Sequence, residues 1–247
     1  MVDLDSTIAE FVEQRNIPIF GIASTQGFAD ALPGWHPKEL MPKCESVIVL
    51  GHPLIQHPLH MEERTYIANR SWWQAQRVVS KQIAAWKGEL FGLLDSLGLG
   101  VASFGVFRPT TSPTFSYRLA QVEAGVGVYG RAGACIHPDY GSYYRVGVLL
   151  TEAKLSPTSR THLDSFHPCE GCSKCGKVCP IKAIDASKEP GGGYDRERCA
   201  RFILNMSERS GTRAYICAQC YSLCPWSMGR LGNKVINTKT EEVQNER

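Results

Sequence analysis

The segment CEGCSKCGKVCP (residues 169–180) places four cysteines at C-x2-C-x2-C-x3-C-P spacing. A later segment, AYICAQCYSLCP (residues 214–225), repeats the end of this pattern but has Ala214 where its first cysteine would stand. A tight loop with C-x2-C-x2-C spacing can deliver three thiolates to one [4Fe–4S] cluster, and a fourth cysteine followed by proline is typical of such runs. The two segments therefore predict an iron–sulfur module in the second half of the chain.

The cysteine count indicates how many clusters this module holds. In two-cluster ferredoxins the cysteine that precedes proline ligates the other cluster, so Cys179 and Cys224 are expected to exchange partners. Ala214 cannot bind iron, and Cys199 is the one cysteine left in the segment to replace it. We therefore expect two [4Fe–4S] clusters, the first held by Cys169, Cys172, Cys175 and Cys224 and the second by Cys179, Cys199, Cys217 and Cys220.

Two other interpretations of the cysteines are weaker. Structural zinc sites also use C-x2-C pairs, but zinc leaves the x3-C-P spacing and the total of eight cysteines in the segment unexplained. Disulfides are typical of secreted chains, and the opening MVDLDSTIAEFVEQ has neither a basic-then-apolar signal region nor a twin arginine. Outside the segment, Cys44 and Cys135 have no partner spacing and are expected to be buried thiols.

The composition is that of an ordinary globular protein. The chain has 247 residues, 43% of them apolar and 21% charged, and a formal net charge of +3. So small a net charge does not by itself indicate nucleic-acid binding, and no apolar run in the sequence is long enough to span a membrane. We expect a cytoplasmic location and no membrane partner.

Upstream of the cysteines, short apolar runs alternate with segments of helical periodicity. Strands are expected at residues 17–23, 46–51, 101–107 and 143–150, helices at 4–14, 62–97 and 116–124, and a glycine-rich loop at 125–133. This alternation predicts an α/β sandwich over about residues 1–152. The polar, turn-rich residues 154–168 indicate a boundary. We expect three parts: a domain at residues 1–155, the cysteine-rich module at 156–230 and a C-terminal tail at 231–247.

The cysteine pattern also indicates a family. With RC at residues 198–199 and CPW at 224–226, it resembles epoxyqueuosine reductase, the cobalamin-dependent iron–sulfur enzyme of tRNA queuosine synthesis, whose wider group includes the reductive dehalogenases. The resemblance extends upstream to FGIA (residues 20–23), HPKELMPKCESVIVLGHPL (36–54) and RLAQVEAGVGVYGRAGACIHPDYGSYYRVGVLLTE (118–152). It covers most of residues 18–228 and is patchy over the long helix expected at 62–97.

This resemblance implies a fold and a cofactor. The fold would be α/β (α+β), with a nitroreductase-like sandwich domain followed by a two-cluster ferredoxin-like module and a corrinoid (cobalamin) where the two meet. The candidate cofactor-binding residues lie in GVGVYGRAG: Gly125, Gly127, Tyr129, Gly130 and Arg131. The glycines would let the backbone approach a large planar cofactor or a phosphate, although a plain glycine-rich turn explains them too. Where the family has Gly-Lys, Gly130-Arg131 keeps the cation.

The sequence departs from the family at the proton donor. Epoxyqueuosine reductases carry an acidic residue shortly before an Ala-Pro pair. Matching Ser112-Pro113 to that pair puts Thr110 in place of the acid, and the Glu-Arg that follows becomes Ser116-Tyr117. A threonine hydroxyl is too weak an acid to act in the same way near neutral pH. Thr110 and Tyr117 are the candidate catalytic residues. Tyr117 and Tyr129 are candidate replacement donors, with simple packing of both tyrosines as the alternative.

Histidines and tryptophans upstream have simpler explanations than a role in the site. The histidines of GHPLIQHPLH could be metal or axial ligands, but the prolines beside them indicate a solvated loop; they are His52, His57 and His60. The tryptophans of the long helix favour core packing over a stacking platform; they are Trp72, Trp73 and Trp86.

The resemblance favours an oxidoreductase that passes single electrons through the two clusters to the corrinoid, with a flavodoxin or ferredoxin as electron donor. Its substrate would be a small molecule or a corrinoid, and not epoxyqueuosine itself, because the acid is replaced. Two alternatives stay open: a non-catalytic electron-transfer or corrinoid-reducing partner, and a module that binds tRNA or another ligand with structural clusters. The arginines scattered from Arg196 to Arg230 allow tRNA binding but are more simply a solvated face, so tRNA is not favoured as a partner.

Overall fold

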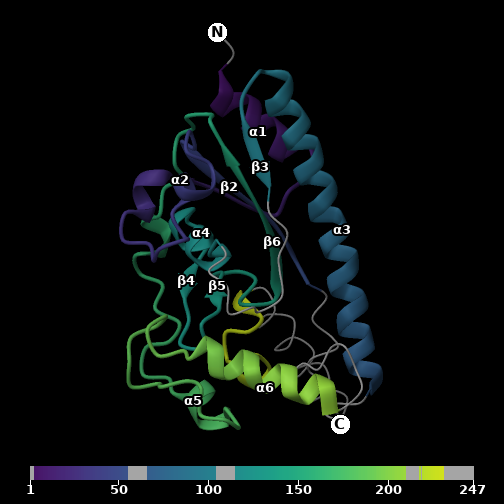
Figure 1. Ribbon diagram of the computed structural model, residues 1–247. Coiled ribbons are helices and arrows are strands. Elements are labelled where there is room, and N and C mark those ends of the chain that lie inside the picture. The colour runs from purple at the N-terminus through teal and green to yellow at the C-terminus, as the bar shows by residue number, and fades with distance from the viewer. Residues whose placement is uncertain (1–2, 55–65, 104–114, 210–216, 218, 231–247) are drawn as a thin grey trace, which may run out of the picture. The chain divides into compact units, whose positions relative to one another are not determined.

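The computed structural model describes residues 3–54, 66–103, 115–209, 217 and 219–230 (Figure 1). The chain forms two compact units. The first comprises Met1–Leu54, Ala75–Gly127 and Tyr144–Ser165, and the second comprises Ile55–Gln74, Val128–Tyr143 and Phe166–Arg247. Residues 128–143 therefore pack with the cysteine-rich segment, although they precede it by some distance in the chain. The expected division into domains at residues 1–155, 156–230 and 231–247 stays a prediction.

The first unit is built on a four-stranded sheet. Its strands are β1 (Ile19–Ser24), β2 (Ser46–Pro53), β3 (Val101–Ser103) and β6 (Tyr144–Thr151), in the order β1-β2-β6-β3. Every neighbouring pair is antiparallel. The strands expected from the apolar runs are thus present, β3 as far as residue 103, and the fold is a mixed α/β one of the α+β kind.

Buried residues of β2 explain its central place in the sheet. Val47, Ile48, Val49 and Leu50 have no exposed surface, so both faces of the strand are covered. A strand buried on both faces is apolar at consecutive positions, whereas a half-exposed strand alternates apolar with polar residues. The apolar run in the sequence therefore corresponds to a strand with a strand on either side and further layers above and below.

The helix α3 (Tyr66–Ser96) covers one face of the sheet (Figure 1). Gly147 of β6 lies opposite Leu50 of β2, and opposed residues of an antiparallel pair point to the same face. A Cβ atom at Gly147 would lie 2.7 Å from Ile83 on α3, so the glycine allows the helix to lie close to the strand. The helix buries one stripe toward the sheet, made of Val79, Ile83, Trp86, Leu90 and Leu94. The expected core position of Trp86 is confirmed.

The helix α4 (Tyr117–Glu123) covers the other face. Gly21 of β1 lies opposite Val49, one position away from Leu50, so it points to the face opposite that of Gly147. A Cβ atom at Gly21 would collide with the carbonyl oxygen of Ala124, the residue that ends α4. Glycine in β1 therefore permits the end of α4 to approach the sheet backbone directly.

Short helices complete the first unit. Helix α1 (Leu4–Gln14) begins where the Asp3 carboxylate accepts a hydrogen bond from the Ser6 N–H, and it buries Ile8 and Phe11. The other helices are the 3-10 turns η1 (Thr25–Phe28) and η3 (Thr161–Leu163) and the single turn α2 (Pro37–Leu40). Of the described helices, none is long and apolar enough to cross a membrane.

The second unit contains a small hairpin and three helices. Strands β4 (Val128–Tyr129) and β5 (Cys135–Ile136) pair antiparallel, and the helices are α5 (Lys174–Val178), α6 (Arg196–Arg209) and α7 (Gln219–Ser222). The glycine-rich segment 125–133, expected as a loop, therefore contains a strand. Gly130 closes the hairpin by donating its N–H to the Ala134 carbonyl at 2.7 Å, and Gly133 adopts a left-handed φ of +69°.

Other sequence-based expectations have mixed outcomes. Cys44 and Cys135 are buried thiols, as expected. His52 lies in strand β2 and not in a solvated loop, because the β2 pairing with β6 continues to Pro53, and its ring lies 5.9 Å from that of Trp86. His57, His60, Thr110 and the tail at 231–247 lie outside the described residues, as do the side chains of Trp72 and Trp73.

Candidate iron–sulfur site

The first three cysteines lie on a tight turn followed by one short helix. The Cys172 N–H donates to the Cys169 carbonyl at 3.2 Å, and Gly171 between them has a left-handed φ of +63°. Glycine adopts this φ without the strain that a Cβ atom would cause. Helix α5 then starts at Lys174 and carries Cys175 on its first turn. The C-x2-C-x2-C spacing thus brings three thiols within one turn and the start of one helix.

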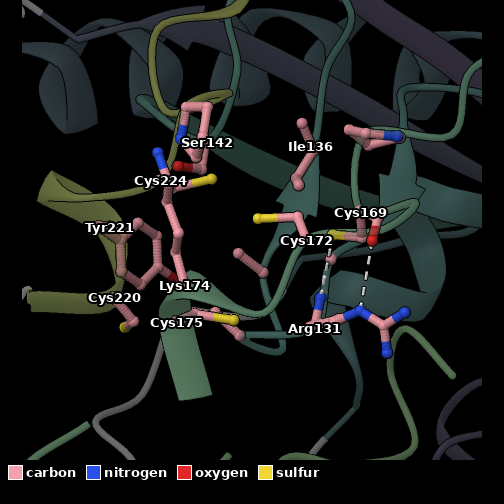
Figure 2. Close-up of a pocket in the computed structure, with 15 residues that line it drawn as sticks. Arg131, Ile136, Ser142, Cys169, Cys172, Lys174, Cys175, Cys220, Tyr221 and Cys224 are labelled. Carbon is pink, nitrogen blue, oxygen red and sulfur yellow. Dashed lines mark hydrogen bonds between the residues drawn. The ribbon is translucent and has the colours of Figure 1, made fainter. Parts of the chain in front are cut away.

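Four expected ligands of the first cluster line a single pocket in the second unit (Figure 2). Cys169, Cys172 and Cys175 come from the turn and α5, and Cys224 comes from the segment after α7. Cys220, an expected ligand of the second cluster, lines the same pocket. The rest of the lining comes from the β4–β5 hairpin, from Ser142, from residues 168–175 and from residues 221–225, and most of it is apolar. Segments far apart in the sequence thus meet around five thiols.

Cys179 lies in a neighbouring buried cluster. It is buried with Ala183 and Ile184, and three further cysteines pack against this cluster: Cys175, Cys199 and Cys220. The Cys179 sulfur also accepts a hydrogen bond from the Ala183 N–H at 3.2 Å. Cys199 is on the first turn of α6, so the helix after the turn-rich segment returns this cysteine toward the others. Cys199, the expected replacement for Ala214, therefore lies near Cys179 and Cys220, two of its expected partners.

Burial and repulsion between thiolates keep Cys220 and Cys224 protonated. Burial, with a smaller contribution from the charges of Cys169, Cys172 and Cys175, raises the pKa of Cys224 to about 11. Burial likewise raises the pKa of Cys220 to about 12, with smaller contributions from four cysteines: Cys217, Cys199, Cys175 and Cys179. Several buried thiols so close together can ionise jointly when a cation binds them. The donor set therefore suits iron.

The charges of Cys169, Cys172 and Cys175 contribute to the raised pKa of Cys224, and those of Cys217, Cys199, Cys175 and Cys179 contribute to that of Cys220. Within the described ranges, however, no three His, Cys, Asp or Glu side chains already converge on one metal-sized point. The fit to clusters thus rests on the number, identity and grouping of the thiols around the pocket. The assignment of each cysteine to a cluster stays a prediction.

The candidate cofactor-binding residues of the glycine-rich segment fall into both units. Gly125 and Gly127 follow α4 in the first unit, and Gly125 has a left-handed φ of +70°. A Cβ atom at Gly125 would lie 3.3 Å from the Ser159 carbonyl oxygen, so this glycine makes room for the chain's own backbone. Tyr129 lies in β4, and Gly130 and Arg131 line the cysteine pocket. Their contact with a corrinoid stays a prediction.

Tyr117, a candidate proton donor, is the first residue of α4. Its ring lies 6.3 Å from that of Phe115 in an edge-to-face arrangement, and burial raises its pKa to about 12. A phenol with a raised pKa remains protonated near neutral pH, but it gives up its proton less readily than an ordinary tyrosine. Its catalytic role stays a prediction, as does that of Thr110.

Three polar residues of the pocket were not among the candidates: Ser142, Lys174 and Tyr221. Lys174 lies between Cys172 and Cys175, and Tyr221 lies between Cys220 and Cys224. Their positions in the sequence could therefore have indicated that they line the cysteine pocket. Ser142 lies far from both runs, and its position depends on the hydrogen bond that its N–H donates to the Ser227 carbonyl at 3.0 Å. Within the described part of the chain its hydroxyl oxygen is buried without a hydrogen-bond partner.

Comparisons with known proteins agree on one group of reductases. A scan of family models finds none that matches. Among curated proteins, the epoxyqueuosine reductase of Francisella cf. novicida (strain Fx1) is 29% identical over 209 residues, which cover 77% of this chain and 55% of the relative. Together with the cysteine pattern in the pocket, this similarity supports a relation of the chain to the epoxyqueuosine reductase-like family.

Solved structures share the fold of this epoxyqueuosine reductase-like chain. Epoxyqueuosine reductase from Bacillus subtilis matches with a TM-score of 0.61 at 18% identity, over 91% of this chain and 66% of that one. A reductive dehalogenase described as B12-dependent matches with a TM-score of 0.69 at 16% identity, over 93% of this chain and 33% of that one. Another matching structure is an epoxyqueuosine reductase with a modified tRNA stem loop. The chain spans about half the length of the curated relatives that it matches.

Proposed function

We propose that this epoxyqueuosine reductase-like chain is an iron–sulfur oxidoreductase with two [4Fe–4S] clusters that deliver single electrons to a corrinoid. The observation that carries the proposal is the meeting of five thiols around one pocket, with Cys179 and Cys199 in the adjacent buried cluster. Relatives of this chain include reductases and dehalogenases, which supports a redox role for the thiols. A cluster bound at these thiols would accept and pass on one electron at a time.

The protein's own contribution at the pocket is to hold the thiols and limit solvent. Cys179 is 8% exposed, and the apolar side chains of Ala134 and Ile136 line the pocket beside the cysteines. Low solvent exposure and N–H groups directed at sulfur are two means by which a protein sets the potential of a cluster. Such N–H groups include that of Ala183, which donates to the Cys179 sulfur, and that of Arg131, which donates to the Cys169 sulfur.

The corrinoid and the substrate class are the further parts of the proposal. A reductive dehalogenase described as B12-dependent shares the fold, and the glycine-rich segment with Tyr129, Gly130 and Arg131 is the candidate contact for such a cofactor. We propose that the substrate is a small molecule or a corrinoid and not epoxyqueuosine, since Thr110 stands where the family has an acid. A flavodoxin or ferredoxin would supply the electrons.

Anaerobic reconstitution tests the clusters directly. Protein reconstituted with iron and sulfide should hold about eight iron and eight sulfide per chain, as two cubane clusters require. Cys199→Ala should lower the iron content to about half, whereas Cys135→Ala removes a buried thiol outside the proposed set and should leave it unchanged. Two zinc ions per chain and no iron–sulfur absorbance would contradict the proposal.

Cobalamin binding separates the enzyme from its alternatives. The reconstituted protein should change the absorbance spectrum of added cobalamin and, with a reduced flavodoxin, convert it to a lower-valent form. Debromination of a bromophenol would identify a dehalogenase-like activity, and turnover of an epoxyqueuosine-modified tRNA stem loop would contradict the proposed substrate class. A protein that takes up both clusters but neither binds nor reduces cobalamin would be an electron-transfer partner.

A further inference from the structure

Arg131 joins two separate segments of the second unit through hydrogen bonds. Its backbone N–H donates to the Cys169 sulfur at 3.4 Å, and its Nε donates to the Cys169 carbonyl at 3.4 Å (Figure 2). From the same guanidinium, Nη1 donates to the Ala186 carbonyl at 2.8 Å and also to the Lys188 carbonyl. The side chain therefore holds the turn with the first cysteine to the segment that follows Cys179.

The cysteine turn lies near the surface of the second unit. None of residues 168–172 is buried, and the turn itself is closed by the backbone hydrogen bond from Cys172 to Cys169. Arginine suits the linking role because its planar guanidinium offers five N–H donors in a fixed arrangement, whereas a lysine ammonium is a point charge on a flexible chain. Where the family has Gly-Lys, this chain has Gly130-Arg131. The arginine offers additional N–H donors, and they donate to the carbonyls of Cys169, Ala186 and Lys188.

The charge of Arg131 also acts on the same site. Among the ion pairs between described residues, none joins Arg131 to a carboxylate. A cubane cluster with four thiolate ligands carries net negative charge, and that charge grows when the cluster is reduced. A nearby unneutralised cation therefore favours the reduced form and raises the reduction potential of the cluster.

We infer that Arg131 is a positioning residue for the first cluster: it fixes the turn that presents Cys169, and its charge raises the potential of that cluster. The inference rests on the proposed function for the presence of the cluster, but the hydrogen bonds to the Cys169, Ala186 and Lys188 carbonyls belong to the polypeptide itself. It differs from a direct contact with a cofactor, because the guanidinium is directed at carbonyl groups of the chain.

Amide hydrogen exchange of the anaerobically reconstituted protein tests the link. Arg131→Met should speed exchange about tenfold in peptides covering residues 167–175 and 185–189, the effect of losing roughly 1.4 kcal/mol from local opening. Arg131→Lys should show a smaller increase, since the ammonium cannot reach all three carbonyls in the same geometry. The matched control Arg209→Met removes an exposed arginine from the end of α6 and should leave both peptides unchanged.

Unchanged exchange in Arg131→Met would overturn the inference. If the second unit of that variant does not fold, seen as fast exchange throughout α6, Arg131→Lys decides, and equal exchange with the wild type would overturn the inference. Wild-type protein that takes up no iron yet keeps protection in residues 167–175 allows the same comparison with Arg131→Met. Such protein would contradict the proposed function while still showing whether Arg131 links the two segments.

A redox titration followed by electron paramagnetic resonance tests the charge. In Arg131→Met one cluster should shift to a more negative potential while the other keeps its wild-type value, and Arg131→Lys should shift less. Arg209→Met should leave both clusters at their wild-type potentials. An equal shift of both clusters, or no shift in either, would show that Arg131 does not tune the first cluster.

Discussion

The two units of this chain are held together by different kinds of contact. The first unit has a continuous apolar core, in which Leu90 and Leu94 of α3 and Leu149 of β6 have no exposed surface. The second unit has a buried cluster at Cys179, Ala183 and Ile184, and several of the side chains packed on that cluster are cysteines. Apolar burial stabilises the first unit from the chain alone, whereas the thiols of the second have little to gain from burial until something binds them.

The two units also differ in what their glycines allow the backbone to approach. In the first unit Gly21 and Gly147 let helices approach a regular sheet. In the second, glycines let irregular segments touch each other directly: a Cβ atom at Gly133 would enter the ring of Tyr194, and one at Gly141 would meet the backbone of Trp226 and Ser227. A unit made of turns has few regular backbone hydrogen bonds, so we expect its order to depend on the proposed iron–sulfur clusters.

Removal of iron should have the largest effect and act on one unit alone. Chelation should bring amide exchange of residues 169–180 and 196–209 close to the unfolded rate, because structural metal sites in small domains contribute roughly 10 kcal/mol. Exchange in β2 and β6 should not change, since their burial needs no cofactor. Equal loss of protection in both units would show that the first unit depends on the second.

Leu90→Ala is the converse experiment. Leu90 is fully buried on α3, so its truncation should lower the free energy of unfolding of the first unit by about 2–5 kcal/mol, measured by urea denaturation. Phe91→Ala, at a neighbouring side chain that is 40% exposed, should change it by less than about 0.5 kcal/mol. The iron content of folded Leu90→Ala should equal that of the wild type, and loss of iron would contradict the independence of the second unit.

Gly133→Ala should weaken the second unit by a smaller amount. The alanine would combine a left-handed φ of +69° with a Cβ only 2.7 Å from Cγ of Tyr194, a cost of about 1–3 kcal/mol. We expect earlier loss of iron–sulfur absorbance on heating, with an unchanged transition in the first unit. Gly192→Ala is the matched control, since its nearest neighbouring atom would lie 3.6 Å away. Equal behaviour of the two variants would mean that Tyr194 moves aside at no cost.

Much of the first unit could be predicted from the sequence because its signals are local. The helix expected at residues 4–14 matches α1, and the run expected at 46–51 lies within β2. The antiparallel order of the strands was not predictable in this way, since it depends on pairs such as Leu50 with Gly147, nearly a hundred residues apart in sequence. His52 was misassigned to a loop for the same reason: prolines nearby are a local signal, and the pairing of β2 with β6 overrides it.

In the second unit, the cysteine spacing predicted a metal-binding role but not which other segments pack around the thiols. The cysteine pattern predicted a tight loop that carries three thiols, and the structure has a turn followed by the short helix α5. It could not show that residues 128–143 would join them, because that association is made by long-range contacts such as those of Arg131 and of Gly141. The arginine had been assigned to a cofactor from the resemblance alone, and its carbonyl partners became visible only with the fold.

The smallest predicted effect concerns pH and distinguishes the units once more. Burial raises the pKa of Glu123 above its ordinary value, although the ion pair with Arg160 at 2.7 Å acts in the opposite direction. A carboxyl whose pKa is higher in the folded than in the unfolded state favours folding when protonated. The stability of the first unit should therefore fall as the pH rises from the ordinary glutamate value through the folded one, and then level off.

Glu123→Gln should abolish this fall in the urea midpoint between pH 4 and pH 7, while Glu89→Gln, which removes a surface ion pair with Arg15, should retain it. The Arg160 side chain is 46% exposed, so solvent screens its attraction to Glu123. We therefore expect the free energy of unfolding to change by less than about 1 kcal/mol over this pH range. Cys220 and Cys224 of the second unit titrate at alkaline pH, since burial raises the pKa of both thiols. A midpoint that rises with pH in the wild type and not in Glu123→Gln would show that Arg160 outweighs burial at this carboxyl.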